Sequence, residues 1–272
     1  MILQMQNLPK HWIQPDWPIN DRVRALMTSR QGGVSSAPWD SMNLGDHVGD
    51  RAADVQTNRE RLASRIGQRP VFLQQVHGVA SVQLGAATPN GLVADACWSG
   101  ETGVACTIMV ADCLPVLLAD AAGRWVAAAH AGWRGLAGPA VSTQSKGQGV
   151  LESLWSDIQR AGADVSDVMA WLGPCIGPQA FEVGPEVLAA FDDGSPQVQA
   201  QFQPVANGKF MADLAGLARV RLQALGVTSV FGNDSSLPWC TVSNSALFFS
   251  HRRDSRRLGQ SGRMAACIWL ES

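Results

Sequence analysis

Three short apolar runs in the middle of the chain constrain the fold more than any other feature. They cover residues 104–110, 114–119 and 125–129 and contain no charged side chain. Runs of this length and composition are typical of β-strands that are buried on both faces. Such strands have to be covered on each side, so these runs predict the centre of a layered domain.

The rest of the chain alternates between strand-like and helix-like segments. Because no long linker interrupts this alternation, we predict a single domain of the α/β, mixed α+β, class. Residues 1–25, rich in Trp, Pro and Asp, are expected to be an irregular lead-in to a domain over residues 26–272. The patterns predict strands over residues 23–27, 71–82, 168–172, 227–231, 246–249 and 264–270, and helices over 53–66, 150–158, 185–191 and 213–225.

The turn from Asp120 to Gly123 joins the second and third apolar runs and predicts a hairpin. In the simplest register Cys113 lies opposite His130, with Cβ atoms roughly 4.5–5.5 Å apart. A thiolate and an imidazole at this separation can share a metal ion. His77, which ends a short apolar run before a glycine, is the candidate third ligand. One Cys and two His suit zinc with a fourth position open to water; the alternative is a buried thiol with hydrogen-bonded histidines.

Composition excludes several classes of protein. The net charge is −2 and the isoelectric point is near 6.2, which gives no general attraction to nucleic acid or anionic membranes. No run of 18 apolar residues exists, and the N-terminus lacks the features of a signal peptide. We expect a cytoplasmic protein, whose six cysteines would be free thiols or ligands.

Glycine-containing loops carry the candidate substrate-binding residues. Arg30 precedes two glycines that free backbone amides for an anion, and Asn43 and His47 belong to a polar loop. Trp133 and Arg134 follow His130 closely and would supply an aromatic wall and a cation for a purine and its sugar or phosphate. The alternatives are a surface turn at Arg30, a solvated His47, and a core Trp133 with Arg134 exposed.

Two further features leave their roles open. Asp112, beside the candidate ligand Cys113, faces away from it in a regular strand, and a bulge would bring its carboxylate round as a proton carrier. The basic run 251–257 is expected to be a solvated loop, or to gather a phosphate through its arginines. We therefore consider Asp112, Arg134 and His47 as candidate catalytic residues.

Five motifs follow one another along the chain. They are Gln74-Gln75-Val76-His77-Gly78, Ala111-Asp112-Cys113, His130-Ala131-Gly132-Trp133-Arg134-Gly135, Gly173-Pro174-Cys175-Ile176-Gly177 and Ser250-His251-Arg252-Arg253-Asp254. Together they resemble the motifs of the YfiH-type family, which is called both laccase-domain (polyphenol oxidase) and purine nucleoside phosphorylase. Two positions depart from the usual pattern, with Ser29 and Ser261 where the family mostly has Thr.

The resemblance implies a YfiH-like catalytic domain, a mixed β-sheet sandwich flanked by helices, with zinc on His77, Cys113 and His130. It implies phosphate-dependent cleavage of adenosine, inosine, guanosine and methylthioadenosine, together with adenosine deamination. The partners would be a nucleoside and phosphate, with no nucleic acid or membrane, and the protein would be a monomer or weak homodimer.

The alternative functions come from other classes of protein. One is a hydrolase that edits peptidoglycan precursors, and another is a binding protein with a structural zinc. A four-copper oxidase needs many imidazoles, and five histidines with no His-x-His pair cannot supply them. Polyphenol oxidase activity is then expected only where copper substitutes for zinc.

Overall fold

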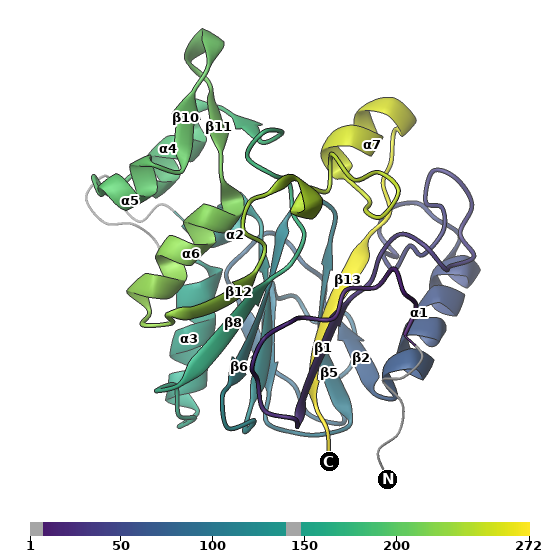
Figure 1. The fold of residues 1–272 in the computed structure, drawn as a ribbon. Coiled ribbons are helices and arrows are strands. Elements are labelled where there is room, and N and C mark those ends of the chain that lie inside the picture. Colours follow the sequence, from purple (N-terminus) through teal and green to yellow (C-terminus); the bar gives the residue numbers. More distant parts are fainter. Residues whose placement is uncertain (1–7, 140–147) are drawn as a thin grey trace.

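The computed structural model describes residues 8–139 and 148–272, which form a β-sandwich with helices on its outer faces (Figure 1). Thirteen strands in three sheets and seven helices make up this part of the chain. The mixed α/β class and the flanked sandwich expected from the sequence are therefore confirmed. No helix in these two ranges is long and apolar enough to cross a bilayer.

The sheets differ in size and in strand order. The four-stranded sheet has the order β1 (Val23–Met27), β13 (Met264–Leu270), β5 (Val104–Val110) and β2 (Arg69–Phe72). The six-stranded sheet has the order β12 (Ser229–Gly232), β8 (Val168–Leu172), β6 (Leu114–Asp120), β7 (Val126–Ala131), β4 (Ala96–Ser99) and β3 (Ser81–Gln83). The third sheet has the order β10 (Phe202–Pro204), β11 (Phe210–Ala212) and β9 (Glu182–Val183).

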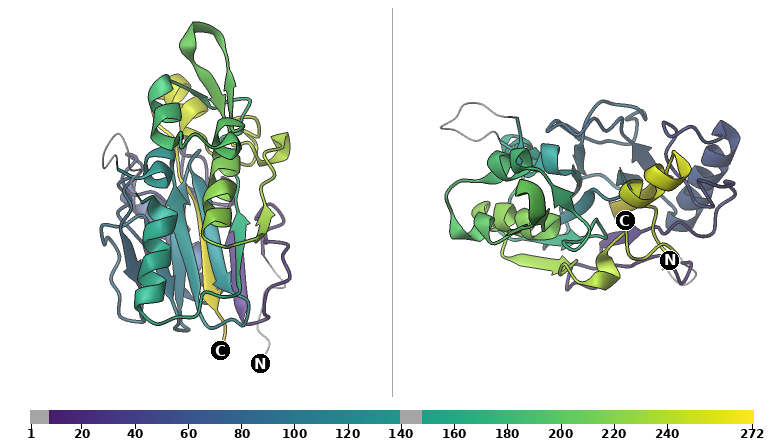
Figure 2. Two further views of the ribbon diagram at one scale, coloured as in Figure 1. Left: turned by 90° about the vertical axis from the view of Figure 1, so that its left-hand side faces the viewer. Right: turned by 90° about the horizontal axis from the view of Figure 1, so that it is seen from above.

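The α-helices are α1 (Ala52–Ile66), α2 (Trp133–Ala137), α3 (Val150–Arg160), α4 (Pro185–Phe191), α5 (Pro196–Gln199), α6 (Leu214–Ala224) and α7 (His251–Leu258). Two short 3₁₀ turns cover Ala206–Gly208 and Leu237–Trp239. The left panel of Figure 2 views the sandwich from the side covered by α3 and α6. The side chains of α3 that recur at helical spacing are buried, as the sequence predicted.

Side-chain alternation along the central strands separates three layers of core. On β5, Cys106 and Ile108 pack between the two large sheets, whereas Ala105 and Met109 pack on the outer side toward α1. On β6, Leu117 faces the inner core and its neighbours face the helices. Burying a Leu, Ile or Met side chain contributes about 1.5–3 kcal/mol, so the apolar runs that define the strands also hold the sheets together.

The predicted hairpin of β6 and β7 exists, but its register differs from the expected one. Pro115, not Cys113, lies opposite His130. Ala119 lies opposite Val126, because Arg124 belongs to the connecting loop, where its backbone and guanidinium donate to Asp120. Cys113 and His130 are therefore diagonal neighbours on one face of the sheet, a relation that still allows contact.

Three other sequence expectations are corrected. Residues 71–82 form two strands, β2 and β3, joined by the loop that carries His77. Residues 246–249 form no strand, and only Phe248 and Phe249 among them are buried. Residues 251–258 form the helix α7 and not a loop, because Ser250 caps its N-terminus and Gly259 adopts φ 79° at its C-terminus.

Candidate metal centre and surrounding pocket

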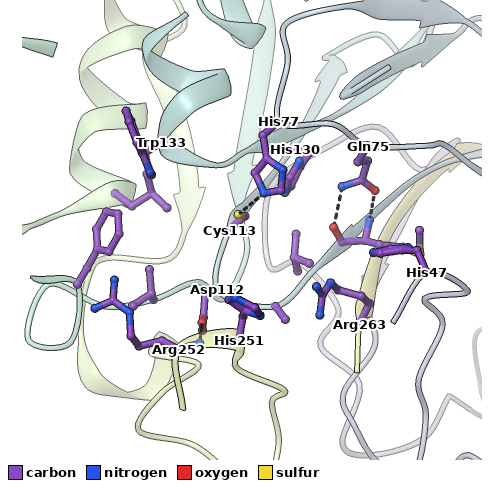
Figure 3. A pocket seen from close by; sticks show the side chains of 16 residues that line it. His47, Gln75, His77, Asp112, Cys113, His130, Trp133, His251, Arg252 and Arg263 are labelled. Atoms are coloured by element: carbon purple, nitrogen blue, oxygen red, sulfur yellow. Dashed lines mark hydrogen bonds between the residues drawn. The ribbon is translucent and has the colours of Figure 1, made fainter. Parts of the chain in front are cut away.

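His77, Cys113 and His130 come together at one end of the sandwich (Figure 3). Their potential ligand atoms all lie within 4.8 Å of one another, and the Cys113 Sγ–His77 Nε2 distance is 3.7 Å. The imidazole rings meet edge to face, with centroids 4.8 Å apart. Three donor atoms thus converge on one point from a loop, a strand start and a strand end.

Local features of the backbone place two of the three side chains, His77 and Cys113. His77 has φ 60°, an uncommon conformation for a residue with a Cβ, which turns the loop after β2. Asp112 has φ 87° and interrupts the chain between β5 and β6, so that Cys113 turns toward the sandwich end. Gly132 leaves the space that both side chains need, because a Cβ there would lie 2.9 Å from Cys113 Sγ and 3.1 Å from His77 Cδ2.

Asp95 positions both histidines through hydrogen bonds to the His130 ring and to the backbone of His77. Its fully buried carboxylate accepts a 2.8 Å hydrogen bond from His130 Nδ1, which leaves Nε2 of that ring to face the site. The same carboxylate accepts backbone N–H groups from Val76, His77 and Gly78 at 3.1, 2.9 and 2.7 Å. A carboxylate that orients a ligating imidazole in this way is a regular companion of metal sites.

The electrostatics of the site favour a thiolate. Burial alone would raise the pKa of Cys113, but the imidazoles of His130 and His77 outweigh it and lower the pKa to about 6. Burial likewise opposes charge on His130, and the Cys113 thiolate and Asp95 raise its pKa to about 9. The thiolate is the form that binds metals.

The residues fit a zinc-type ion. A tetrahedral zinc with Zn–S near 2.3 Å and Zn–N near 2.0 Å separates sulfur from nitrogen by about 3.5 Å, and the observed Cys113–His77 separation is 3.7 Å. One sulfur and two nitrogens leave one tetrahedral position without a protein ligand from the trio. No other group of three or more His, Cys, Asp or Glu side chains in residues 8–139 and 148–272 lies close enough to share an ion.

A cavity of about 380 Å³ opens beside the trio. This volume falls in the range of small-molecule sites. One part of the lining is apolar and aromatic, and another part is basic (Figure 3). Besides the trio, the lining residues are His47, Gln75, Met109, Val110, Ala111, Asp112, Trp133, Ile176, Phe181, Leu214, His251, Arg252 and Arg263.

The carboxylate of Asp112 lines this cavity but is already engaged. Its Oδ1 accepts a 2.5 Å hydrogen bond from Thr241 Oγ1, and its Oδ2 accepts a 2.6 Å hydrogen bond from the backbone N–H of Arg252. These contacts tie the segment before Cys113 to the N-terminal turn of α7. The positive φ, which the sequence did not predict, brings the carboxylate round.

The candidate substrate residues fall into two groups. His47 and Trp133 line the cavity. Arg134 is exposed and lies outside the lining, with its guanidinium 4.4 Å from the centre of the Trp133 ring. Arg30 is held away from the cavity by Asp40 at 3.2 Å and packs on Phe249. The buried Asn43 is likewise outside the lining and bonds to backbone groups.

Five residues of the site were not predicted from the sequence as site residues. Asp95 gave one usable signal, an acidic side chain inside an otherwise apolar segment. His251 and Arg252 belong to the run that was expected to be a solvated loop, and the helix α7 brings them to the cavity. Gln75 exchanges hydrogen bonds of 2.8 Å with the backbone of Met109. Arg263 had no distinguishing pattern.

Comparisons with known proteins place the chain among relatives with this fold. Residues 24–271 match the family described as multi-copper polyphenol oxidoreductase laccase. The chain belongs to this family. A purine nucleoside phosphorylase of Pseudomonas aeruginosa is 50% identical over 262 residues, covering 96% of this chain and 98% of that protein. Purine nucleoside phosphorylase YfiH of Escherichia coli is 44% identical over 261 residues, covering 95% and 98%.

Solved structures of family members share the architecture. A Neisseria meningitidis protein superposes with a TM-score of 0.84 at 41% identity, covering 97% of this chain and 100% of that one. YlmD of Geobacillus stearothermophilus superposes with a TM-score of 0.84 at 30% identity, covering 98% of each chain. The YfiH-type resemblance drawn from the sequence motifs is thereby confirmed.

Proposed function

We propose that this chain is a zinc-dependent purine nucleoside phosphorylase that also deaminates adenosine. Its substrates would be adenosine, inosine, guanosine and methylthioadenosine, cleaved with inorganic phosphate. The observation that carries the proposal is the His77, Cys113 and His130 trio, backed by Asp95, in the wall of a cavity of about 380 Å³. Relatives that share 50% and 44% identity and are named purine nucleoside phosphorylases support it.

His77, Cys113 and His130 would hold the metal. When bound, a zinc ion supplies Lewis acidity, which activates water at neutral pH. Copper binds such nitrogen and sulfur ligands more tightly than zinc, so copper loading offers a route to oxidase chemistry. The single trio found in the described part of the chain supports one metal and gives no support to a four-copper mechanism.

In phosphorolysis, a phosphate oxygen forms a bond to C1′ of the ribose as the bond from C1′ to the purine nitrogen breaks. The electron pair of that bond goes to the purine, which takes up the proton that hydrogen phosphate loses. Deamination adds water at C6 of adenosine and releases ammonia, so that inosine is formed. Both reactions need a purine that is bound in a fixed position. Phosphorolysis also needs a bound phosphate, and deamination needs an activated water.

The lining residues have complementary roles in this proposal. Trp133 offers a ring face on which a purine stacks, and Arg134 packs against that ring from outside the cavity. His47 stands at the cavity with 55% of its side chain exposed, where it can donate to substrate. Asp112 has a positioning role, because its two carboxylate oxygens accept hydrogen bonds from Thr241 and from the backbone of Arg252. Asn43 supports Arg263, and Arg30 stabilises its own loop.

Product chromatography tests the proposal. Zinc-loaded protein incubated with adenosine should give adenine and ribose 1-phosphate only when phosphate is present, and inosine in either case. Cys113→Ala should lose both the metal and turnover, whereas Cys97→Ala, which removes a sulfur that is not part of the trio, should keep both.

Other products would point to the rival functions. Release of a free amino acid from a peptidoglycan precursor, with adenosine unchanged, would replace the proposal with a cell-wall editing hydrolase. Full activity of metal-free Cys113→Ala would contradict the assigned metal centre. Oxidation of phenols by zinc-loaded protein would contradict the view that oxidase chemistry depends on copper.

A further inference from the structure

We propose that Arg263, flanked by His47 and His251, binds the inorganic phosphate that the proposed phosphorolysis consumes. This inference rests on the proposed function and adds to it the place of the second substrate. All three residues line the same cavity as the metal trio. In the view of Figure 3, His251 and Arg263 lie across the cavity from His77 and Cys113.

Arg263 has no carboxylate partner, in contrast to several arginines near it in the fold. Arg30, Arg59 and Arg253 pair with carboxylates at 3.2, 3.2 and 2.7 Å. Within residues 8–139 and 148–272, no carboxylate lies within 4.0 Å of the Arg263 guanidinium. A cation that lines a cavity without an ionic partner is suited to an anionic ligand.

The hydrogen bonds of Arg263 leave one edge of its guanidinium available. Nη1 donates to the backbone carbonyls of Ser261 and Gly262 at 2.9 and 3.1 Å. In the part of the chain that the structure describes, Nε and Nη2 have no acceptor. Their N–H groups form the planar fork that binds two phosphate oxygens at once.

The loop around Asn43 holds Arg263 in this position. The Asn43 Oδ1 atom accepts the backbone N–H of Arg263 at 2.8 Å, and the backbone N–H of Leu44 donates to the Arg263 carbonyl at 3.0 Å. Gly45 makes room for the stem, since a Cβ there would lie 2.8 Å from Arg263 Cγ. The same loop carries His47, so one short segment positions two of the three phosphate-binding residues.

The two parts of the cavity suit the two parts of the reaction. Trp133 and Phe181 provide aromatic surface for the purine, and Figure 3 shows Trp133 on the side away from Arg263. The engaged Asp112 carboxylate already accepts hydrogen bonds from Thr241 and Arg252, which limits its repulsion of an anion. Phosphate at Arg263 and purine at Trp133 would leave the ribose between them, where C1′ has to react.

Isothermal titration calorimetry of zinc-loaded protein with inorganic phosphate, without nucleoside, tests the site. Because charged hydrogen bonds contribute about 1.5–3 kcal/mol each, Arg263→Gln should weaken phosphate binding about tenfold or more. Arg263→Lys, which keeps the charge but loses the fork, should give an intermediate affinity. Arg256→Gln, an exposed residue of α7 with the same change of charge, should leave the affinity within twofold.

A second variant acts without touching the charged group. Gly45→Ala should displace the Arg263 stem and raise the KM for phosphate more than the KM for adenosine. Near-ultraviolet circular dichroism of the variants, with ten tryptophans as probes, reports whether each is folded. If Arg263→Gln does not fold, the lysine and alanine variants carry the test alone.

Unchanged phosphate affinity in folded Arg263→Gln or Arg263→Lys would overturn the site, whatever products adenosine gives. Arg263-dependent binding of adenosine 5′-monophosphate, with no binding of free phosphate, would also overturn it in favour of a nucleotide phosphate. Arg263-dependent phosphate binding without any phosphate-dependent cleavage would uphold the site and contradict the proposed function. The phosphate site at Arg263 and the proposed phosphorylase function can therefore be contradicted independently.

Discussion

Replacing Asp95 with Asn should weaken metal binding although it removes no metal ligand. The carboxylate is fully buried and accepts four hydrogen bonds, from His130 Nδ1 and from three consecutive backbone N–H groups. The amide of Asn has one oxygen that accepts and one NH₂ group that donates. If the NH₂ group takes the place of Oδ2, the backbone N–H groups of Val76 and Gly78 lose their acceptor. Each unsatisfied buried donor costs about 1–3 kcal/mol, which amounts to about 2–6 kcal/mol of stability for the two.

The same change affects the metal through His130. In this variant His130 Nδ1 donates to an uncharged amide oxygen in place of the carboxylate, and changes in the group that orients a ligating imidazole weaken metal binding about 10–100-fold. Competition with a chromophoric chelator measures the zinc affinity, and urea denaturation monitored by tryptophan fluorescence measures the stability. We expect both quantities to fall in Asp95→Asn.

Asp120→Asn is a matched control for this prediction. Asp120 is also fully buried and also accepts charged hydrogen bonds, from Arg124 at 2.6 and 2.7 Å. It lies at the other end of β6, about 20 Å along the strand from Leu114. This variant should lose stability and keep its zinc affinity within twofold. If Asp95→Asn and Asp120→Asn bind zinc equally well, Asp95 does not support the metal centre.

Three more predictions follow from particular contacts. Gly132→Ala should lower zinc affinity in a chelator competition because its Cβ would press on Cys113 and His77, whereas Gly100→Ala, whose Cβ would meet its nearest atom at 3.4 Å, should not. Trp133→Ala should raise the KM for adenosine about 5–150-fold, since stacking of a base on an aromatic ring contributes about 1–3 kcal/mol, and Trp133→Phe should keep most of the affinity. Burial raises the pKa of Asp120, but the hydrogen bonds and charge of Arg124 outweigh this effect and lower it. The stability that the ionised carboxylate contributes is therefore present at neutral pH and lost below about pH 4. The urea midpoints of wild type and Asp120→Asn should converge at acid pH.

The sequence was sufficient to predict the central strands because their burial is nearly complete. Every residue of β5, β6 and β7 is buried, so the apolar runs and the strands coincide. The register was not predictable in the same way, since it depends on the hydrogen bonds of Arg124 to Asp120 in the connecting loop. The trio could be proposed despite the wrong register because a shift of two residues keeps Cys113 and His130 on the same face.

The remaining site residues depend on tertiary contacts that leave little trace in the local sequence. The helix α7 buries only Asp254, so it has no apolar stripe to reveal it, and its caps at Ser250 and Gly259 were the available signals. Arg263 reaches the cavity because a distant loop, around Asn43, holds its backbone. Asp112 points into the cavity because of its positive φ, which no residue pattern predicts.

X-ray absorption at the zinc edge of the zinc-loaded protein tests the proposed metal centre most directly. We expect one sulfur at about 2.3 Å, two imidazole nitrogens at about 2.0–2.1 Å and one further light atom that changes when substrate is added. Cys113→Ala should remove the sulfur signal. A zinc site without sulfur, or one with four protein ligands that substrate leaves unchanged, would contradict a catalytic metal on His77, Cys113 and His130.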